Sequence, residues 1–190
     1  MQKVMVLTAS TRPGRVGPKI TEWFKTITDQ RHDMEFDYVD LLDFNLPMYD
    51  EPEHPMSGHY VHEHTKNWSK TVDKFDAFVM VTPEYNHGYP AAIKNAIDYL
   101  YHEWHHKPVG FVGYGVNAGV RSVEQLRQVV LNLQMVPVNS TPHVGFNVFT
   151  EIDELGNLII HEGKASAAKG LLDELKWWSE TLTPAREKSI

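Results

Sequence analysis

Short apolar runs alternate along this chain with longer amphipathic stretches, and this alternation limits the possible folds more than any other feature of the sequence. The run AFVMV at 77–81 contains no polar residue, which is typical of a strand covered on both faces of a sheet. Further apolar runs and one alternating stretch bring the predicted strands to five, at 4–10, 35–41, 77–81, 108–115 and 136–139. We therefore expect a parallel sheet whose crossover connections lie on its two faces.

Helical periodicity fills the intervals between these strands. Pro18 suits the first turn of a helix, where a missing N–H costs nothing. Four apolar residues follow it at helical spacing: Ile20, Trp23, Phe24 and Ile27. The same spacing predicts further helices at 62–73, 93–100, 120–134 and 164–182. The expected fold class is α/β and flavodoxin-like, with a five-stranded parallel sheet in the order 2-1-3-4-5 and helices on both faces, in one domain spanning 1–190.

Two segments fit this alternation less well. Residues 45–60 hold three prolines and are expected to form a stiff loop that covers either the functional site or a neighbouring subunit. Within 139–163, the sequence DELGNLII predicts a turn and a short extra strand.

Charge and cysteine content exclude several classes of function. The chain has 18 Lys and Arg against 25 Asp and Glu, a net charge of −7, whereas general nucleic-acid binders need a basic surface. It has no cysteine, which excludes disulfides, thiolate catalysis and cysteine metal sites. No apolar run approaches the roughly 20 residues of a membrane-spanning helix, and the N-terminal run is too short for a signal peptide. We expect a cytoplasmic protein that binds neither nucleic acid nor membranes.

In an open parallel sheet, ligands bind beside the carboxyl ends of the strands, near the point where the strand order reverses. The loops that follow the first, third and fourth strands lie there and form the candidate site. The first loop, ASTRPGRVGPK at 9–19, combines a hydroxyl at Ser10 with the charges of Arg12 and Arg15. Gly17 allows a tight turn into a helix, and a helix start attracts phosphate through its free N–H groups. The pattern of a nucleotide-hydrolysing P-loop is absent. We expect a phosphate site; the alternative is an ordinary turn with solvated arginines.

The second loop begins directly after the apolar third strand. Pro83 fixes one backbone angle and Gly88 permits unusual ones, so the residues between them can turn N–H groups toward a flat heteroaromatic ligand. Tyr85 is expected to pack on or beside that ring. As an alternative, Glu84 and Asn86 serve only to tie the turn together.

The third loop, GYGVNAGVR at 113–121, resembles a dinucleotide fingerprint but fails as one. Its spacing is G-x-G-x-x-x-G, one residue too long, and it follows the fourth strand instead of the first. It suits a flexible wall beside a flat ligand. Arg121 is expected either to tie this loop down or to face a partner chain.

Taken together, STRPGRVG, PEYNHGYPAAIKNAIDYL and GYGVNAGVRS resemble the NADPH-dependent FMN reductase family, which includes quinone reductases, azoreductases and chromate reductases. The resemblance covers nearly the whole chain, and the PEYN turn with the helix after it is its most specific part. It implies a flavodoxin-like fold, FMN as cofactor, NADPH or NADH as co-substrate, and a homodimer or homotetramer with the flavin near the subunit boundary.

The resemblance also implies which residues hold the flavin. Its phosphate is expected to lie against Ser10, Arg12, Arg15, Val16 and Gly17. Its isoalloxazine ring is expected to lie against Pro83, Glu84, Tyr85 and Asn86, with Gly115 and Gly119 as a wall near the pyrimidine end. The chain departs from the family pattern at Ala9, Arg15, Gly17, Gly88 and Ala118. These departures are expected to shift individual contacts without destroying the site.

The expected activity is a ping-pong oxidoreduction. Nicotinamide passes a hydride to the flavin and leaves, and a quinone, azo compound, flavin or similar small acceptor then takes two electrons in the same place. Because the flavin carries the chemistry, no side chain is named as catalytic; His87 is the best placed proton donor, although a solvated histidine is the simpler interpretation.

Three other interpretations remain open at this point. A flavodoxin-type electron carrier has the same fold without NAD(P)H oxidation. A flavin-free relative keeps the loops but not the cofactor. Histidine clusters at 59–64 and 102–106 suggest metal binding, since His102, His105 and His106 share one face if the third helix extends that far. Further ligands are missing from the pattern, so no metal site is expected.

Overall fold

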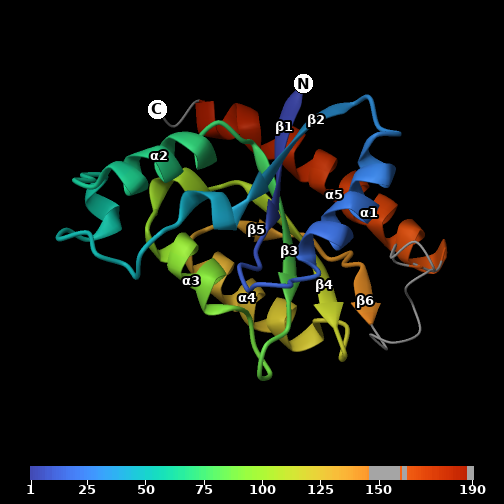
Figure 1. Ribbon diagram of the computed structural model, residues 1–190. Coiled ribbons are helices and arrows are strands. Elements are labelled where there is room, and N and C mark those ends of the chain that lie inside the picture. Colours follow the sequence, from blue (N-terminus) through green and yellow to red (C-terminus); the bar gives the residue numbers. More distant parts are fainter. Residues whose placement is uncertain (146–158, 160–161, 188–190) are drawn as a thin grey trace.

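The computed structural model describes residues 1–145, Ile159 and 162–187 and shows a parallel sheet with helices around it (Figure 1). The strand order is β2-β1-β3-β4-β5, with β6 also paired to β4. The strands are β1 (Gln2–Thr8), β2 (Met34–Asp40), β3 (Ala77–Pro83), β4 (Pro108–Gly115), β5 (Val136–Pro137) and β6 (His143–Gly145). The α-helices are α1 (Gly17–Thr28), α2 (Glu63–Val72), α3 (Ala91–Asp98), α4 (Val120–Asn132) and α5 (Glu162–Glu187). The predicted fold class and strand order are confirmed.

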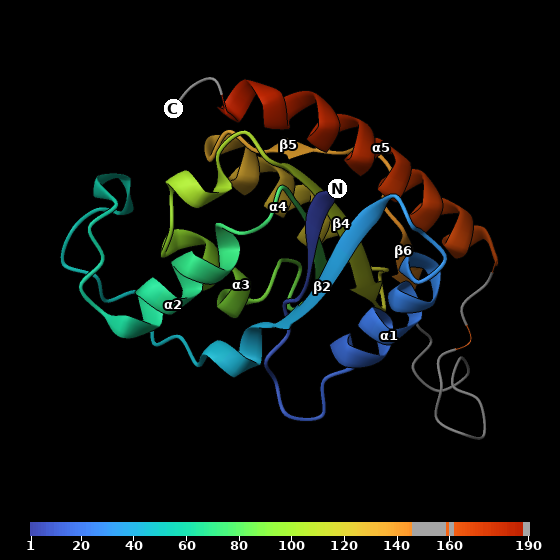
Figure 2. The same ribbon diagram turned by 90° about the horizontal axis from the view of Figure 1, so that it is seen from above.

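Successive residues of the central strands supply two separate hydrophobic cores. Val4 and Val6 of β1 pack in a cluster with residues of α1 and α5. Met5 and Leu7, which point to the opposite face, pack in a second cluster with residues of α2, α3 and α4. Figure 2 shows α1 and α5 along one side of the sheet, and α2 and α3 along the other. Both faces are therefore covered, which explains why β3 is buried at every position and apolar from Ala77 to Val81. In the described part of the chain, no helix is both long and apolar enough to cross a bilayer.

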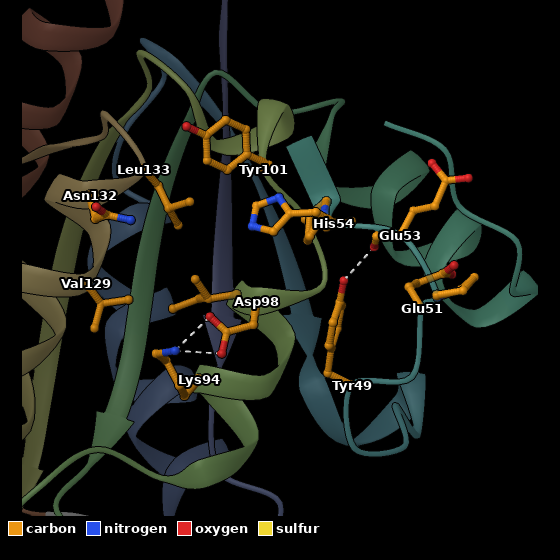
Figure 3. Close-up of a pocket in the computed structure, with 14 residues that line it drawn as sticks. Tyr49, Glu51, Glu53, His54, Lys94, Asp98, Tyr101, Val129, Asn132 and Leu133 are labelled. Atoms are coloured by element: carbon orange, nitrogen blue, oxygen red, sulfur yellow. Dashed lines mark hydrogen bonds and ion pairs between the residues drawn. The ribbon is translucent and has the colours of Figure 1, made fainter. Parts of the chain in front are cut away.

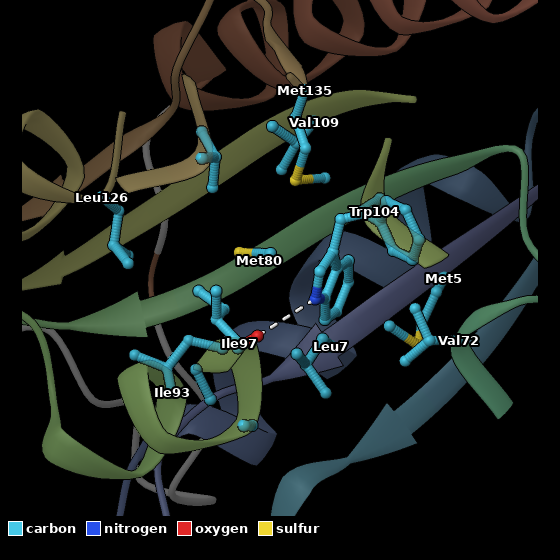
Figure 4. Close-up of a cluster of buried hydrophobic side chains, with 14 of the residues drawn as sticks. Met5, Leu7, Val72, Met80, Ile93, Ile97, Trp104, Val109, Leu126 and Met135 are labelled. Atoms are coloured by element: carbon cyan, nitrogen blue, oxygen red, sulfur yellow. Dashed lines mark hydrogen bonds between the residues drawn. The ribbon is translucent and has the colours of Figure 1, made fainter. Parts of the chain in front are cut away.

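Two buried tryptophans anchor the core on the α2–α4 side. Trp104 packs edge-on against Phe78 of β3, with 5.0 Å between the ring centroids, and donates its indole N–H to the carbonyl of Ile97 at 3.2 Å (Figure 4). Trp68 of α2 donates in the same way to the carbonyl of Ala96 at 2.8 Å. Both indoles are thus fully buried with their polar atom satisfied, as buried tryptophans require. The two bonds hold the C-terminal half of α3 in place.

The fifth strand is broken into two short pieces, which the sequence did not predict. β5 pairs with the start of β4 and β6 pairs with its end. Between them the chain leaves the sheet at Asn139 and Ser140, whose backbone N–H groups donate to Glu174 of α5 at 2.7 and 3.0 Å. Arg127 of α4 also holds the segment between β5 and β6, because its side chain donates to the Val138 carbonyl at 2.6 Å. Contacts to two helices therefore replace the missing strand pairing. The predicted extra strand in DELGNLII lies outside the described residues, apart from Ile159.

The proline-rich segment 45–62, here called the strap, is fixed against α3. The side chain of Asn95 donates to the carbonyl of Pro47 at 2.6 Å and accepts from the N–H of Tyr49 at 2.9 Å. The hydroxyl of Tyr99, one turn later, donates to the same Pro47 carbonyl at 3.2 Å. Because α3 follows directly after the second candidate loop, these bonds fix the strap relative to the site. Its predicted covering role remains a prediction.

Helix α3 is too short to align the histidines that follow it. It ends at Asp98, and His102–Trp104 forms a separate 3-10 turn. His102, His105 and His106 therefore do not share one helical face. Among the described residues, no three His, Asp or Glu side chains are grouped so that they could hold a metal ion.

Candidate functional site

The first loop buries Ser10 beneath the start of α1. A Cβ added to Gly17 would lie 2.3 Å from Ser10 Oγ and 2.8 Å from the hydroxyl of Tyr114, so only glycine allows the helix to begin this close to both. The N–H groups of Val16 and Gly17 have no acceptor among the described residues, as is normal for a helix start. These groups and the positive end of the helix dipole are available to an anion.

The two arginines of the first loop have different surroundings. Arg15 forms two bonds of 2.6 Å with the carboxylate of Asp40 at the end of β2, and it also donates to the carbonyl of Ser10 at 2.5 Å. The charge of Arg15 is thus paired, and its bonds to Asp40 tie the first loop to β2. Arg12 is exposed and has no ion-pair partner within the described residues. Of the two, Arg12 is the arginine whose charge is free for a ligand.

The second loop is a two-residue β-hairpin turn. Tyr85 and Gly88 exchange two backbone hydrogen bonds, from Tyr85 N–H at 2.9 Å and from Gly88 N–H at 3.1 Å. Asn86 and His87 between them have φ angles of +49° and +73°. Two positive φ angles at the centre of a two-residue hairpin define a type I′ turn. The loop is therefore rigid and hydrogen-bonded, not a flexible connection.

The hairpin changes which N–H groups can meet a ligand. The sequence predicted that the backbone of 84–88 can turn its N–H groups toward a flat ligand. In the structure, Glu84 N–H donates to the Tyr114 carbonyl at 3.1 Å, and two more of these N–H groups are used within the turn. Within 84–88, only Asn86 and His87 keep N–H groups that have no acceptor in the described part of the chain. Both residues are exposed. The number of available donors is smaller than predicted, and their position is better defined.

Helix α4 holds the second loop from the side. Arg121 forms a 2.7 Å ion pair with Glu84, and its backbone N–H donates to the other carboxylate oxygen at 3.1 Å. Because Gly119 offers no side chain to cap α4, the carboxylate of Glu84 takes that place at the positive end of the helix. Gln125, one turn later, donates to the carbonyl of His87 at 2.8 Å. Arg121 ends the third loop, so these bonds tie the third loop to the second, which is one of the two roles predicted for it. Its other predicted role, facing a partner chain, stays a prediction.

The third loop depends on glycine at two positions. Gly115 has a φ of +140° and lies beside Glu84, with an added Cβ at 3.8 Å from its backbone nitrogen. Gly119 has a φ of +69°, and an added Cβ would lie 2.4 Å from the backbone nitrogen of Tyr114. The loop therefore folds back onto the end of β4 and can hold this shape only without side chains at these positions.

Tyr114 connects the three loops. It lies at the end of β4, accepts from Glu84 N–H in the second loop, and places its hydroxyl under Gly17 in the first. Burial raises the pKa of this hydroxyl, while the neighbouring hydroxyl of Ser10 opposes the rise. The predicted site residues thus occupy neighbouring loops at one edge of the sheet, and this tyrosine, which the sequence did not single out, connects them.

One cavity lies away from this edge. It measures about 680 Å³ and opens between the strap and helices α3 and α4, with Tyr49 and His54 on one wall and Val129 on the other (Figure 3). A smaller cavity of about 230 Å³ lies beside the first loop, between Thr11, the residues after β2 and the start of α3. The candidate site itself consists of exposed loops at the sheet edge.

Comparison with known protein families shows to which family the chain belongs. The model for NADPH-dependent FMN reductases matches residues 2–148, which is well over half of the chain. The chain belongs to this family. An NAD(P)H-dependent FMN reductase of Schizosaccharomyces pombe is 42% identical over 135 residues, covering 70% of this chain and 68% of its own. Another, from a Nectria species, is 34% identical over 186 residues and covers 92% of both chains.

Solved structures agree with the observed fold. FerB, a flavoenzyme NAD(P)H:(acceptor) oxidoreductase from Paracoccus denitrificans, superposes with a TM-score of 0.73 over 96% of this chain and 99% of its own, at 24% identity. At that identity the likeness establishes the flavodoxin-like fold. As a member of the FMN reductase family, the chain is an oxidoreductase whose cofactor is FMN and whose co-substrate is NAD(P)H.

The loops fit an FMN molecule on their own chemistry. A dianionic phosphate suits a helix start with a close-packed glycine, with N–H groups and an Arg12 charge that have no partner among the described residues. A flat ring suits the rigid hairpin with two free donors at Asn86 and His87.

Three residues of the site were not predicted from the sequence: Asp40, Tyr114 and Gln125. Their roles depend on partners that are distant in sequence. Only Asp40 gave a signal, as an acid at the end of a strand beside the predicted site.

Proposed function

We propose that this FMN reductase oxidises NAD(P)H and reduces a quinone, azo compound, flavin or similar small acceptor by ping-pong turnover. When bound, FMN supplies the ring that takes two electrons from nicotinamide and gives them to the acceptor. Nicotinamide and the acceptor are both flat, and each in turn binds at the same exposed place over the hairpin. Relatives described as 2-hydroxy-1,4-benzoquinone reductase and quinone reductase, at 25% and 30% identity, support a quinone as the acceptor.

The chain's own residues bind and orient in this proposal. Val16 and Gly17 N–H groups and the Arg12 side chain hold the phosphate, with Ser10 and Arg15 supporting the loop from below and from the side. Pro83, Glu84, Tyr85 and Asn86 border the ring, and Gly115 and Gly119 allow the third loop to approach it as a wall. Donors at Asn86 and His87 favour negative charge on the ring edge that they face.

One observation carries the proposal more than any other. The hairpin 85–88 presents two free N–H groups from a backbone that both internal hydrogen bonds and α4 hold rigid. Donors that are fixed before the reaction stabilise developing charge without reorganising, which is what reduction of a bound ring requires.

Anaerobic stopped-flow mixing tests the proposed function. The FMN-loaded protein is mixed with NADPH or NADH alone, and the reduced protein is then mixed with benzoquinone. We expect at least one nicotinamide to remove the visible absorbance of the flavin without any acceptor present, and benzoquinone to restore it. Absence of reduction by either nicotinamide would favour the electron-carrier interpretation, and reduction only when benzoquinone is also present would contradict ping-pong turnover.

We also propose that the enzyme is a homodimer or homotetramer in the cytoplasm, where NAD(P)H is available. Met48 and Met56 of the strap are 77% and 54% exposed, and Leu131 of α4 is 58% exposed. These exposed apolar side chains lie on the strap and on α4, the elements between which the cavity opens, and they support self-association on this side. Light scattering of the purified protein at micromolar concentration distinguishes one, two and four copies.

A further inference from the structure

The hairpin turn at 85–88 has a conformation that its own sequence favours only in part. Type I′ turns need positive φ at both central positions, and the pair that adopts them most readily is Asn-Gly. This chain has Asn86 followed by His87, whose φ is +73°. Histidine tolerates that region better than most residues, but less well than glycine. Something outside the turn must therefore hold His87 in place.

Gln125 of α4 is placed to do so. Its side-chain amide donates to the carbonyl of His87 at 2.8 Å. The same side chain lies against Gly88, where an added Cβ would be 2.9 Å from Gln125 Oε1. The Arg121–Glu84 pair, one turn earlier on α4, fixes the start of the loop. The helix thus holds the turn at both ends, and Gln125 contacts the end that carries the strained residue.

We propose that Gln125 is a positioning residue for the flavin, because it fixes the His87 carbonyl and thereby the direction of the free N–H groups of Asn86 and His87. The proposal rests on the proposed FMN site, since it assigns those two N–H groups to the ring. Gln125 does not touch the ring in this scheme; it acts through the backbone of the turn. Loss of its hydrogen bond leaves the donors present but no longer held in one direction.

A double-mutant cycle tests this role. Gln125→Met keeps the length of the side chain and removes the donor, and it is expected to weaken FMN binding roughly fivefold and to make the midpoint potential of bound FMN more negative. His87→Gly creates the Asn-Gly pair that favours the turn without help. In that background, Gln125→Met is expected to change FMN affinity less than about twofold, because the turn no longer depends on α4.

Gln128→Met is the matched control. It makes the same chemical change three residues further along α4, at an exposed side chain. It is expected to leave the FMN dissociation constant and the midpoint potential at their wild-type values. Thermal unfolding of each variant is measured beside the FMN titration, since a merely structural role would lower the melting temperature without shifting the potential.

The outcomes separate this proposal from the proposed function. If wild-type protein binds FMN but Gln125→Met matches Gln128→Met in affinity and potential, the positioning role is wrong and the proposed function stands. The same holds if Gln125→Met is equally damaging with glycine at position 87. If wild-type protein takes up no FMN at all, the proposed function fails and the positioning role fails with it.

Discussion

Gly17→Ala is expected to abolish tight FMN binding while leaving a folded protein. The new Cβ would lie 2.3 Å from Ser10 Oγ and 2.8 Å from the Tyr114 hydroxyl, distances that no folded structure accepts. Ser10 is fully buried and Tyr114 is only 4% exposed, so neither has free space to enter. The start of α1 must then move outward, and the N–H groups of Val16 and Gly17 move with it. We expect FMN affinity to fall about a hundredfold and stability by about 2 kcal/mol.

The control for this change is Gly163→Ala in the first turn of α5. An added Cβ there meets nothing within 4 Å, and alanine is the better helix former. It is expected to leave FMN binding unchanged. Fluorescence titration with FMN and chemical unfolding measure the two effects. Wild-type FMN affinity in Gly17→Ala would show that the start of α1 does not hold the phosphate.

Gly119→Ala is expected to be the most destabilising single-methyl substitution among these loops. Its φ of +69° already disfavours a side chain, and the added Cβ would lie 2.4 Å from Tyr114 N and 2.7 Å from the carbonyl carbon of Gly113. Those atoms belong to the backbone of β4 and cannot rotate away. Left-handed strain and overpacking together should cost about 3 kcal/mol or more. The third loop would separate from β4, and FMN binding should weaken as well.

Gly14→Ala separates the two causes. Gly14 has the same φ of +69°, but an added Cβ there meets nothing within 4 Å. Its cost should be limited to conformational strain, about 1 kcal/mol. Gly119→Asn adds a residue that tolerates positive φ but keeps the clash, and it should be about as damaging as Gly119→Ala. Chemical unfolding of the three variants gives the comparison. Equal losses in Gly14→Ala and Gly119→Ala would mean that the contact with β4 contributes little.

The elements with continuous or periodic apolar patterns were predictable from the sequence. β3 and β4 are buried along nearly their whole length, so their residues form apolar runs, and α1 shows its buried face as a helical stripe at Ile20, Phe24 and Ile27. The broken fifth strand was not predictable, because Glu174 and Arg127 hold its middle from two helices. A tertiary contact of that kind leaves no local pattern in the sequence.

The same limit applies to the site. The glycines and the proline marked where the loops turn, but not always for the expected reason. Gly88 was expected to supply an unusual backbone angle, whereas the positive φ angles of the hairpin lie at Asn86 and His87, and Gly17 is required by its close contacts and not by its φ. The sequence did not show that Arg15 pairs with Asp40 or that Glu84 caps α4, because the partners lie 25 and 37 residues away. The sequence therefore predicted both arginines of the first loop, Arg12 and Arg15, as phosphate ligands. In the structure Arg15 is paired with Asp40, and Arg12 has no ion-pair partner among the described residues. The residues of each loop were predictable; their pairing was not.

Comparison of FMN with riboflavin by equilibrium titration tests most directly whether the first loop grips a phosphate while the hairpin holds the ring. The two ligands share the ring and differ only in the phosphate, which the start of α1 and Arg12 are proposed to bind. Charge-assisted hydrogen bonds at a helix start predict FMN binding about a hundredfold tighter than riboflavin. This preference should shrink in Arg12→Gln, which removes the unpaired charge. Equal affinity for the two ligands, or no binding of FMN at saturating concentration, would contradict the proposed site.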